Sequence, residues 1–239
     1  MPIDLDRMKE LSKLFNIDSA NDVDYIRLSL PRINFTIEQL RKYDLTDRHI
    51  CEIGFGAIGL ACHLELGARV DAYDVSDACK AMCDHLGIPW RFLDLSKEIN
   101  MPENFGKYDF IIFCEVIEHI TRSPVDILRE LRSWLKPGGI LLVSTVNLVR
   151  LSNRLRMLAG REIFARYEPG AFVMGHHREY TIEEMGVYLE TAGYAEVKPY
   201  FYAQPDLRYP FLIQQGYNLA VKLFPNFSNL IFALAKNPT

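Results

Sequence analysis

Residues 50–59 read Ile-Cys-Glu-Ile-Gly-Phe-Gly-Ala-Ile-Gly, and Asp74 follows a second predicted strand at 69–73. The first of these runs is typical of a buried parallel strand that breaks at a glycine turn. Gly56 and Gly59 let the backbone of this turn approach a ligand closely before a helix begins. The second strand would bring Asp74 beside the turn, where a carboxylate can accept both hydroxyls of a ribose. The stretch therefore predicts a site for a nucleoside cofactor.

The acid that precedes the glycines narrows the choice of cofactor. The spacing from Gly54 to Gly59, with Asp74 beyond it, also matches the fingerprint of dinucleotide-binding proteins. A pyrophosphate on this turn would be repelled by Glu52, two residues before the first glycine. A cofactor with an ammonium and a sulfonium can use negative charge there. S-adenosylmethionine is such a cofactor, and a nicotinamide-dependent oxidoreductase stays as the alternative.

Five blocks in residues 49–145 closely resemble the class I S-adenosylmethionine-dependent methyltransferases, in the family's order. The blocks are Glu52-Ile-Gly-Phe-Gly56, Tyr73-Asp-Val-Ser76, Phe92-Leu-Asp-Leu95, Tyr108-Asp-Phe-Ile-Ile-Phe-Cys-Glu-Val-Ile-Glu-His119, and Lys136-Pro-Gly-Gly139 before Ile140-Leu-Leu-Val-Ser144. The resemblance implies an α/β fold, a Rossmann-like parallel sheet with an antiparallel last strand and helices on both faces. The chain departs from the family pattern at one point. The family's third glycine usually falls at the position of Ile58, and here it is displaced to Gly59. This displacement leaves the path of the loop open.

The resemblance also implies how the cofactor is held. Glu52, the glycines and Asp74 would hold its amino-acid and ribose parts, and Asp94 would accept the adenine amino group. Asp94 could instead cap the segment that follows it, and Phe55 and Cys114 could serve only in packing. The predicted cofactor-binding set is Glu52, Gly54, Phe55, Gly56, Gly59, Asp74, Val75, Asp94, Leu95 and Cys114.

The hydrophobic pattern from residue 49 onward alternates strands with helices, as in a parallel sheet covered on both sides. Strands are expected near 49–53, 69–73, 90–94, 108–114, 140–145, 196–202 and 230–235, and helices near 58–66, 76–86 and 124–135. Thr181 and Glu184 form a capping-box match that opens a further helix.

The domain organisation follows from where this alternation begins and where it is interrupted. Residues 1–46 are expected to form an N-terminal helical cover, in which Pro31 ends one helix and a second spans 35–43. Residues 47–239 form the methyltransferase domain. Its two insertions, 146–180 and 203–226, are candidates for an acceptor lid.

Composition excludes some classes of protein. The 239-residue chain carries a net charge of −4, so no global basic field indicates nucleic acid. The five cysteines have neither a redox nor a zinc spacing, and we expect reduced thiols in a cytoplasmic protein. No apolar run is long enough to span a membrane, and no signal peptide is evident. The oligomeric state stays open.

Candidate catalytic residues follow the fourth strand, at the edge where parallel sheets bind ligands. They are Glu115, Glu118 and His119, joined by His176 (or, less well placed, His177) from the later Gly-His-His-Arg stretch. Two carboxylates and two imidazoles would suit Mg²⁺, Mn²⁺ or Zn²⁺. The set resembles that of the ubiquinone-pathway O-methyltransferases and the small-RNA terminal 2′-O-methyltransferases. A histidine acting as a general base without metal, or a purely structural Glu118-His119 pair, are the alternatives.

A helix is expected through Leu148 to Leu158, with Arg150, Arg154 and Arg161 on one side. If that side lines the acceptor pocket, an anionic acceptor follows. If it faces outward with the apolar stretch at 211–224, the protein would be expected to bind a membrane surface.

The sequence as a whole predicts a methyltransferase that uses S-adenosylmethionine and transfers the methyl group to a hydroxyl of a small-molecule or lipid-like acceptor. The alternatives are a metal-dependent RNA 2′-O-methyltransferase, a nicotinamide-dependent oxidoreductase and a non-catalytic cofactor-binding protein.

Overall fold

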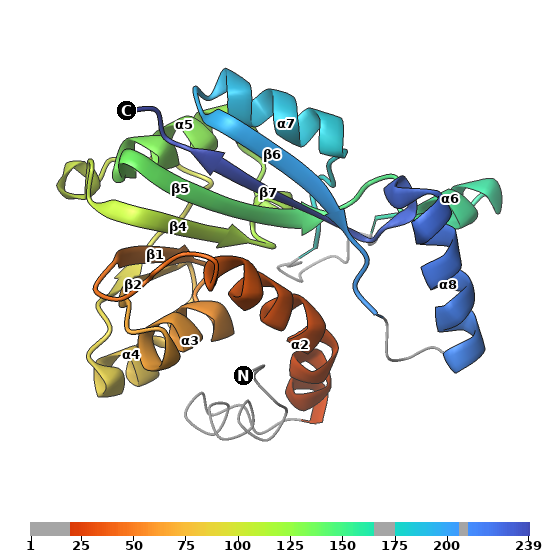
Figure 1. Ribbon diagram of the computed structural model, residues 1–239, viewed down its shortest axis with the longest axis horizontal. Coiled ribbons are helices and arrows are strands. Elements are labelled where there is room, and N and C mark those ends of the chain that lie inside the picture. Colours follow the sequence, from red (N-terminus) through yellow and green to blue (C-terminus); the bar gives the residue numbers. More distant parts are fainter. Residues whose placement is uncertain (1–19, 165–174, 206–209) are drawn as a thin grey trace.

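The computed structural model describes residues 20–164, 175–205 and 210–239 (Figure 1). Several sequence predictions lie outside these residues. They are the first 19 residues of the predicted N-terminal helical cover, and the parts of the two predicted insertions at 165–174 and 206–209.

A seven-stranded sheet in the order β3-β2-β1-β4-β5-β7-β6 forms the centre of the fold. The strands are β1 (His49–Ile53), β2 (Arg69–Asp74), β3 (Trp90–Phe92), β4 (Tyr108–Cys114), β5 (Leu135–Val146), β6 (Ala195–Tyr202) and β7 (Leu230–Lys236). The pairs among β1 to β5 are parallel, and β7 runs antiparallel to both β5 and β6. This arrangement confirms the predicted sheet with its antiparallel last strand.

Helices cover both faces of the sheet (Figure 1). On one face lie α2 (Ala20–Leu40), α3 (Ala57–Glu65) and α4 (Lys80–Leu86), and on the other lie α5 (Pro124–Trp134) and α7 (Ile182–Thr191). The apolar side chains of each layer form one buried cluster with the sheet residues that face it. The predicted two-sided α/β architecture is therefore confirmed.

Local sequence signals determine where α5 and α7 begin. The Ser123 side chain accepts a hydrogen bond from the Asp126 N–H at the start of α5, and Pro124 occupies the first turn, where its missing N–H costs nothing. The predicted capping box between Thr181 and Glu184 opens α7, with both reciprocal hydrogen bonds formed.

Pro31 does not end a helix, contrary to the sequence prediction, because α2 continues through it to Leu40. Packing against β6 supports the helix at this point. The Tyr202 hydroxyl donates to the Pro31 carbonyl at 3.0 Å, and the Phe35 and Tyr202 rings stack with centroids 4.1 Å apart. Ile33 and Ile37 are buried in the α3 layer, so tertiary contacts offset the intrahelical hydrogen bond that proline removes.

Two further helix boundaries differ from expectation. The helix expected over 76–86 begins only at Lys80, because Asp74 accepts from the Ser76 N–H and Ser76 accepts from the Ala78 N–H, which makes turns of this stretch. The strand expected at 140–145 begins already at Leu135. A Cβ at Gly139 would lie 2.9 Å from the Lys136 carbonyl oxygen, so the irregular start of β5 requires this glycine.

The two insertions each contribute a helix that stands away from the sheet, α6 (Leu151–Leu158) and α8 (Phe211–Leu223) (Figure 1). Short 3-10 turns complete the described elements: η1 (Pro102–Asn104), η2 (Ile117–His119) and η3 (Pro225–Phe227).

Candidate active site

The first glycine of the turn closes β1 in a conformation that requires glycine. Gly54 has a φ of +73°, and its N–H donates to the Tyr73 carbonyl at 2.9 Å, which ties the turn to β2. A Cβ on Gly54 would lie 2.6 Å from Val116 Cγ2. The glycine turn therefore lies directly against the segment that follows β4 and carries Glu118 and His119.

Glu52 organises this turn from inside the protein. Its side chain is buried, and Oε2 accepts hydrogen bonds from the N–H groups of Gly56 and Gly59, both at 2.9 Å. Burial raises the pKa of Glu52 to about 7, although the two N–H donors favour the ionised form. Glu52 thus fixes the path of the loop and places a titratable carboxylate under it.

The displaced third glycine has a steric reason. A Cβ on Gly59 would lie 2.4 Å from Glu52 Oε2 and 2.9 Å from the Phe55 ring. Any side chain at position 59 would displace the buried carboxylate. Ile58 is buried and does not have this constraint, so the structure resolves the loop path that the sequence left open.

Asp74 lies at the carboxyl end of β2, half-buried, and accepts from the Ser76 N–H at 2.8 Å. Burial raises its pKa, and backbone N–H donors, including that of Phe55, oppose the shift. Val75, next to it, is exposed. Because β1 and β2 are adjacent and parallel, the carboxylate and the glycine turn occupy the same sheet edge, as predicted.

Asp94 follows β3 and is engaged in a local turn. It accepts from the Ser96 N–H at 3.0 Å and from the Ser96 hydroxyl at 2.5 Å, and Lys97 lies 3.2 Å away. The Ser96 hydroxyl is the main cause of its lowered pKa. Asp94 therefore stabilises a local turn, and it caps no helix, because the next element along the chain is η1 at Pro102–Asn104. Leu95 is buried beside it, and Cys114 is partly buried at the end of β4.

Three of the four predicted catalytic residues form a cluster, in which Glu118 and His119 come from the turn after β4 and His176 from the segment before α7. One ligand atom each of Glu118, His119 and His176 lies within 4.8 Å of the others. Glu118 is fully buried, and its Oε2 accepts from the Thr145 hydroxyl at 2.9 Å. Its other oxygen, Oε1, is buried without a hydrogen-bond partner among the described residues. Burial, reinforced by the nearby Glu115 carboxylate, raises the pKa of Glu118 well above its usual range.

Both imidazoles are oriented through Nδ1. His119 Nδ1 lies 3.2 Å from the Gly175 carbonyl oxygen, and His176 Nδ1 lies 3.0 Å from Glu179 Oε1. Such acceptors hold the proton on Nδ1 and leave Nε2 as the basic nitrogen. Burial lowers the pKa of His119, so the neutral ring is favoured. One unpartnered buried carboxylate oxygen and two oriented imidazoles fit a divalent cation.

Glu115, the fourth predicted residue, is held outside this cluster. It forms an ion pair with Arg32 of α2 at 2.8 Å and accepts from the Ser144 hydroxyl at 2.7 Å. It has a φ of +55°, an uncommon conformation for a residue other than glycine. His177 is also outside the cluster: its side chain is exposed, and its N–H donates to the Glu118 carbonyl at 2.8 Å.

The sequence did not assign a role to Glu179, the residue that orients His176. Glu179 is buried and also accepts from Arg150 and, at 2.8 Å, from Asn153. These partners lower its pKa despite its burial. The i,i+3 spacing of His176 and Glu179 is a local signal that could have indicated this role. Arg32, which pairs with Glu115, was also missed, and no local spacing indicates it because its partner lies on a distant segment.

The predicted single arginine face is wrong. Gly160, with a φ of +65°, follows the end of α6, so Arg161 lies beyond the helix that carries Arg154. Arg150 precedes the helix and points to Glu179. Arg154 donates to the Val149 carbonyl and lies over the Phe227 ring.

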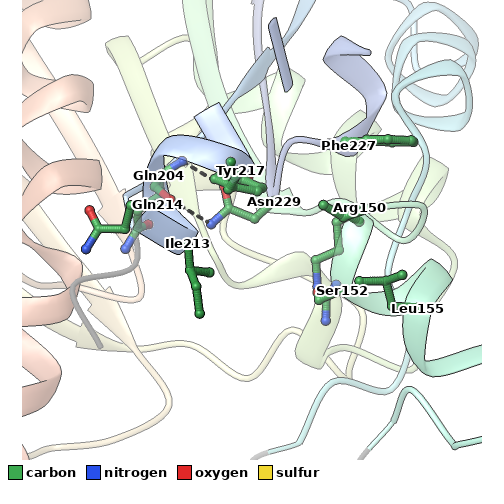
Figure 2. Close-up of a pocket in the computed structure, with 11 residues that line it drawn as sticks. Arg150, Ser152, Leu155, Gln204, Ile213, Gln214, Tyr217, Phe227 and Asn229 are labelled. Carbon is green, nitrogen blue, oxygen red and sulfur yellow. Dashed lines mark hydrogen bonds between the residues drawn. The ribbon is translucent and has the colours of Figure 1, made fainter. Parts of the chain in front are cut away.

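A cavity of about 560 Å³ lies between the two projecting helices (Figure 2). Its lining is mainly apolar and comes from α6, α8 and η3, including Leu155, Ile213 and Phe227. Arg150 lies at its wall and connects it, through Glu179, with His176. The cavity is therefore linked to the Glu118–His119–His176 cluster by one chain of side chains.

Comparisons with known proteins agree with this architecture. The family model described as "Methyltransferase domain" matches residues 31–198. A ubiquinone biosynthesis O-methyltransferase of Rickettsia bellii (strain OSU 85-389) is 29% identical over 144 residues, which cover 57% of this chain and 59% of that protein. The chain thus matches less than two thirds of the length of this relative.

Two solved structures share the fold. Phosphoethanolamine N-methyltransferase 2 of Haemonchus contortus, in complex with S-adenosyl-L-methionine, superposes with a TM-score of 0.58 at 14% identity, over 86% of this chain and 52% of that chain. A SAM-dependent methyltransferase from Archaeoglobus fulgidus gives a TM-score of 0.58 at 15% identity, over 89% of this chain and 98% of that chain. At such identities the likeness shows the fold alone.

The family match covers more than half of the chain, and the fold agrees with it. The predicted family is thereby confirmed. The chain belongs to the methyltransferase domain family.

Proposed function

We propose that this protein transfers the methyl group of S-adenosylmethionine to a hydroxyl of a small-molecule acceptor. The observation that carries the proposal is the Glu118–His119–His176 cluster, two of whose members lie on the segment in contact with the glycine turn. A hydroxyl is a poor nucleophile until its proton is removed, and this cluster offers groups for that task. The name of the Rickettsia relative, an O-methyltransferase, supports the same chemistry.

The cofactor would lie across the ends of β1 and β2. Asp74 would accept the ribose hydroxyls, and Gly54 and Gly56 would let the backbone approach the amino-acid part. Glu52 would support the loop from beneath, because its Oε2 already accepts hydrogen bonds from two loop N–H groups. A cationic cofactor nearby would favour the ionised form of Glu52 and would be attracted by it. Phe55, Val75, Leu95 and Cys114 would contribute walls. Asp94 would reach adenine with Oδ2, the oxygen that pairs with the exposed Lys97 in this structure.

Methyl transfer is an in-line displacement at carbon, so orientation of the acceptor supplies much of the rate. His119 presents Nε2, the unprotonated nitrogen of a neutral ring, to the acceptor side. Glu179 keeps the proton of His176 on Nδ1, so that His176 also presents Nε2. A divalent cation on Glu118, His119 and His176 would supply Lewis acidity that lowers the pKa of the acceptor hydroxyl.

The cavity between α6 and α8 supports a lipid-like acceptor over an anionic one. Its walls are mainly apolar. Arg150, the arginine at its wall, is already neutralised by the buried Glu179 carboxylate. The cytoplasmic location of the protein stays a prediction.

Metal binding and turnover together test the proposal. Titration calorimetry with Mg²⁺, Mn²⁺ and Zn²⁺ is compared between the wild type, Glu118→Gln and the neighbouring control His177→Ala. Labelled methyl transfer is then followed on small-molecule extracts and on RNA, with and without chelator. Transfer to a small-molecule hydroxyl that Glu118→Gln abolishes and His177→Ala preserves is expected. Transfer only to RNA, only to amines, or to no acceptor would overturn the proposal.

A second outcome separates the two ways of activating the hydroxyl. Loss of turnover with chelator, matched by metal binding that Glu118→Gln removes, supports the cation. Turnover that is insensitive to chelator and lost in His119→Ala supports His119 as a general base.

A further inference from the structure

The two projecting helices carry exposed apolar side chains. On α8 these are Phe211, Leu212, Leu219 and Leu223, and on α6 they are Met157 and Leu158. We call this set the α6–α8 surface. Leu212 is 81% exposed and Leu158 is 85% exposed. Such exposure of large apolar side chains on neighbouring elements marks an interaction site.

The apolar side chains of α8 form one stripe. Leu212, Leu219 and Leu223 are seven and four residues apart, so they share one face of the helix. Ile213 and Tyr217 lie on another side, toward the cavity (Figure 2). None of the 13 residues of α8 is buried. The stripe is therefore not buried against the described part of the protein.

The polar anchors of α8 hold the stripe outward. The Tyr217 hydroxyl lies 3.3 Å from Asn229 Oδ1, which also accepts from the Gln204 N–H at 2.7 Å. The Gln204 side chain in turn donates to the Leu28 carbonyl of α2. These bonds join α8 to β7, β6 and α2, so the orientation of the stripe is fixed by the fold.

The charge around the surface is positive, in a chain whose net charge is −4. Segments 148–161 and 210–226 contain no Asp or Glu. Arg156, Arg161 and Lys222 are exposed, and within the described residues none of them forms an ion pair with an acid. Apolar side chains flanked by unpaired basic ones are typical of helices that lie in the interface of an anionic membrane.

Charge also argues against a second copy of the chain as the occupant. A two-fold interface pairs the same patch with itself, so the basic side chains Arg156, Arg161 and Lys222 of one copy would be brought near those of the other. Like charges brought together in this way oppose association. An anionic bilayer complements both the stripe and the basic rim. No helix among the described residues is long and apolar enough to cross a membrane, so the contact is with the surface.

We propose that the α6–α8 surface docks on anionic lipid membranes, with the apolar stripe of α8 inserted at the level of the headgroups. Docking at this surface would place the apolar cavity between α6 and α8 next to the bilayer. The inference concerns binding alone, and its test needs neither cofactor nor acceptor. It therefore stands or falls separately from the proposed reaction.

Vesicle flotation with the full chain tests the proposal, using pure phosphatidylcholine and an equal mixture with phosphatidylglycerol. Binding to the mixed vesicles and not to the neutral ones is expected. The double variant Leu212→Gln/Leu219→Gln should lose at least tenfold in partitioning, whereas Val187→Gln, an exposed apolar residue on α7, should bind as the wild type does. Arg161→Gln and Lys222→Gln should each lower partitioning about fivefold. Lys198→Gln, an exposed lysine on β6, is the control.

Circular dichroism and sedimentation accompany the flotation, to show that each variant is folded and to report its mass. Absence of binding, equal binding to neutral and anionic vesicles, or equal losses in the control variants would each overturn the proposal. A dimer in solution that the Leu212/Leu219 double variant dissolves would also overturn it, because the surface would then belong to a second copy.

Discussion

The two halves of the sheet edge differ in how they are built. On the cofactor side, the turn after β1 and the end of β2 are stabilised by groups close in sequence, such as Glu52 with Gly56 and Gly59. On the acceptor side, His176 is oriented by Glu179, which is held by Arg150 and Asn153 from another segment. The cofactor side is a local motif, and the acceptor side is assembled from distant segments. A family can thus keep the first while it changes the second.

Removing His119 should have the largest effect and should separate the two sides. In His119→Ala, turnover is expected to fall about 10²- to 10⁴-fold, because the basic nitrogen nearest the acceptor is lost. S-adenosylmethionine affinity, measured by calorimetry, should hold. His177→Ala, in the exposed neighbour, should turn over normally. Normal turnover in His119→Ala would remove it from the acceptor side.

Gly59→Ala should damage the cofactor side, because its Cβ would lie 2.4 Å from Glu52 Oε2. We expect the free energy of unfolding to fall by about 1–3 kcal/mol, as for other overpacked sites, together with cofactor affinity. Gly216→Ala on α8, whose Cβ would meet no atom within 4 Å, is the matched control. Urea unfolding and calorimetry measure both quantities. Equal stability of the two variants would show that the Glu52 carboxylate moves freely.

Glu179→Gln should affect the acceptor side through His176 rather than through the cofactor. Loss of a partner that orients a catalytic or metal-binding histidine typically costs 10- to 100-fold. Turnover should fall by about that factor, with cofactor affinity unchanged. Glu183→Gln, an exposed neighbour, is the control. A drop in affinity for S-adenosylmethionine in Glu179→Gln would show that the cofactor side and the acceptor side are not independent.

The smallest expected effect is on the pH dependence of turnover. Burial lowers the pKa of His119 below its usual 6.5, so the ring stays neutral as pH falls through that value. Because the neutral ring is the active form, turnover should change less than about twofold between pH 8 and 6.5. It should fall further only below pH 6.5. Turnover is followed at saturating S-adenosylmethionine, because Glu52, whose pKa burial raises to about 7, would otherwise titrate in the same range. An acid limb centred above pH 6.5 under these conditions would contradict the burial of His119.

The same contrast explains what the sequence could predict. The strand positions, the two-sided helix layers and the place of Asp74 at the sheet edge follow from local periodicity and from motifs whose residues lie close in the chain. The end of α6 before Arg161 follows from Gly160, a local signal that the predicted arginine face did not take into account. The continuation of α2 through Pro31 and the hydrogen bonds of Arg150 and Asn153 to Glu179 depend on contacts between distant segments. Hydrophobic pattern carries no signal for such contacts. The reason for Gly59 became visible only once Glu52 was seen beneath the loop.

Calorimetric titration of S-adenosylmethionine into the wild type, Asp74→Ala and the exposed neighbour control Asp77→Ala tests the central claim most directly. We predict one cofactor per chain for the wild type, an affinity at least tenfold lower in Asp74→Ala, about 1.4 kcal/mol, and an unchanged affinity in Asp77→Ala. Equal affinities in Asp74→Ala and wild type, or no binding by the wild type, would contradict the placement of the cofactor at the ends of β1 and β2.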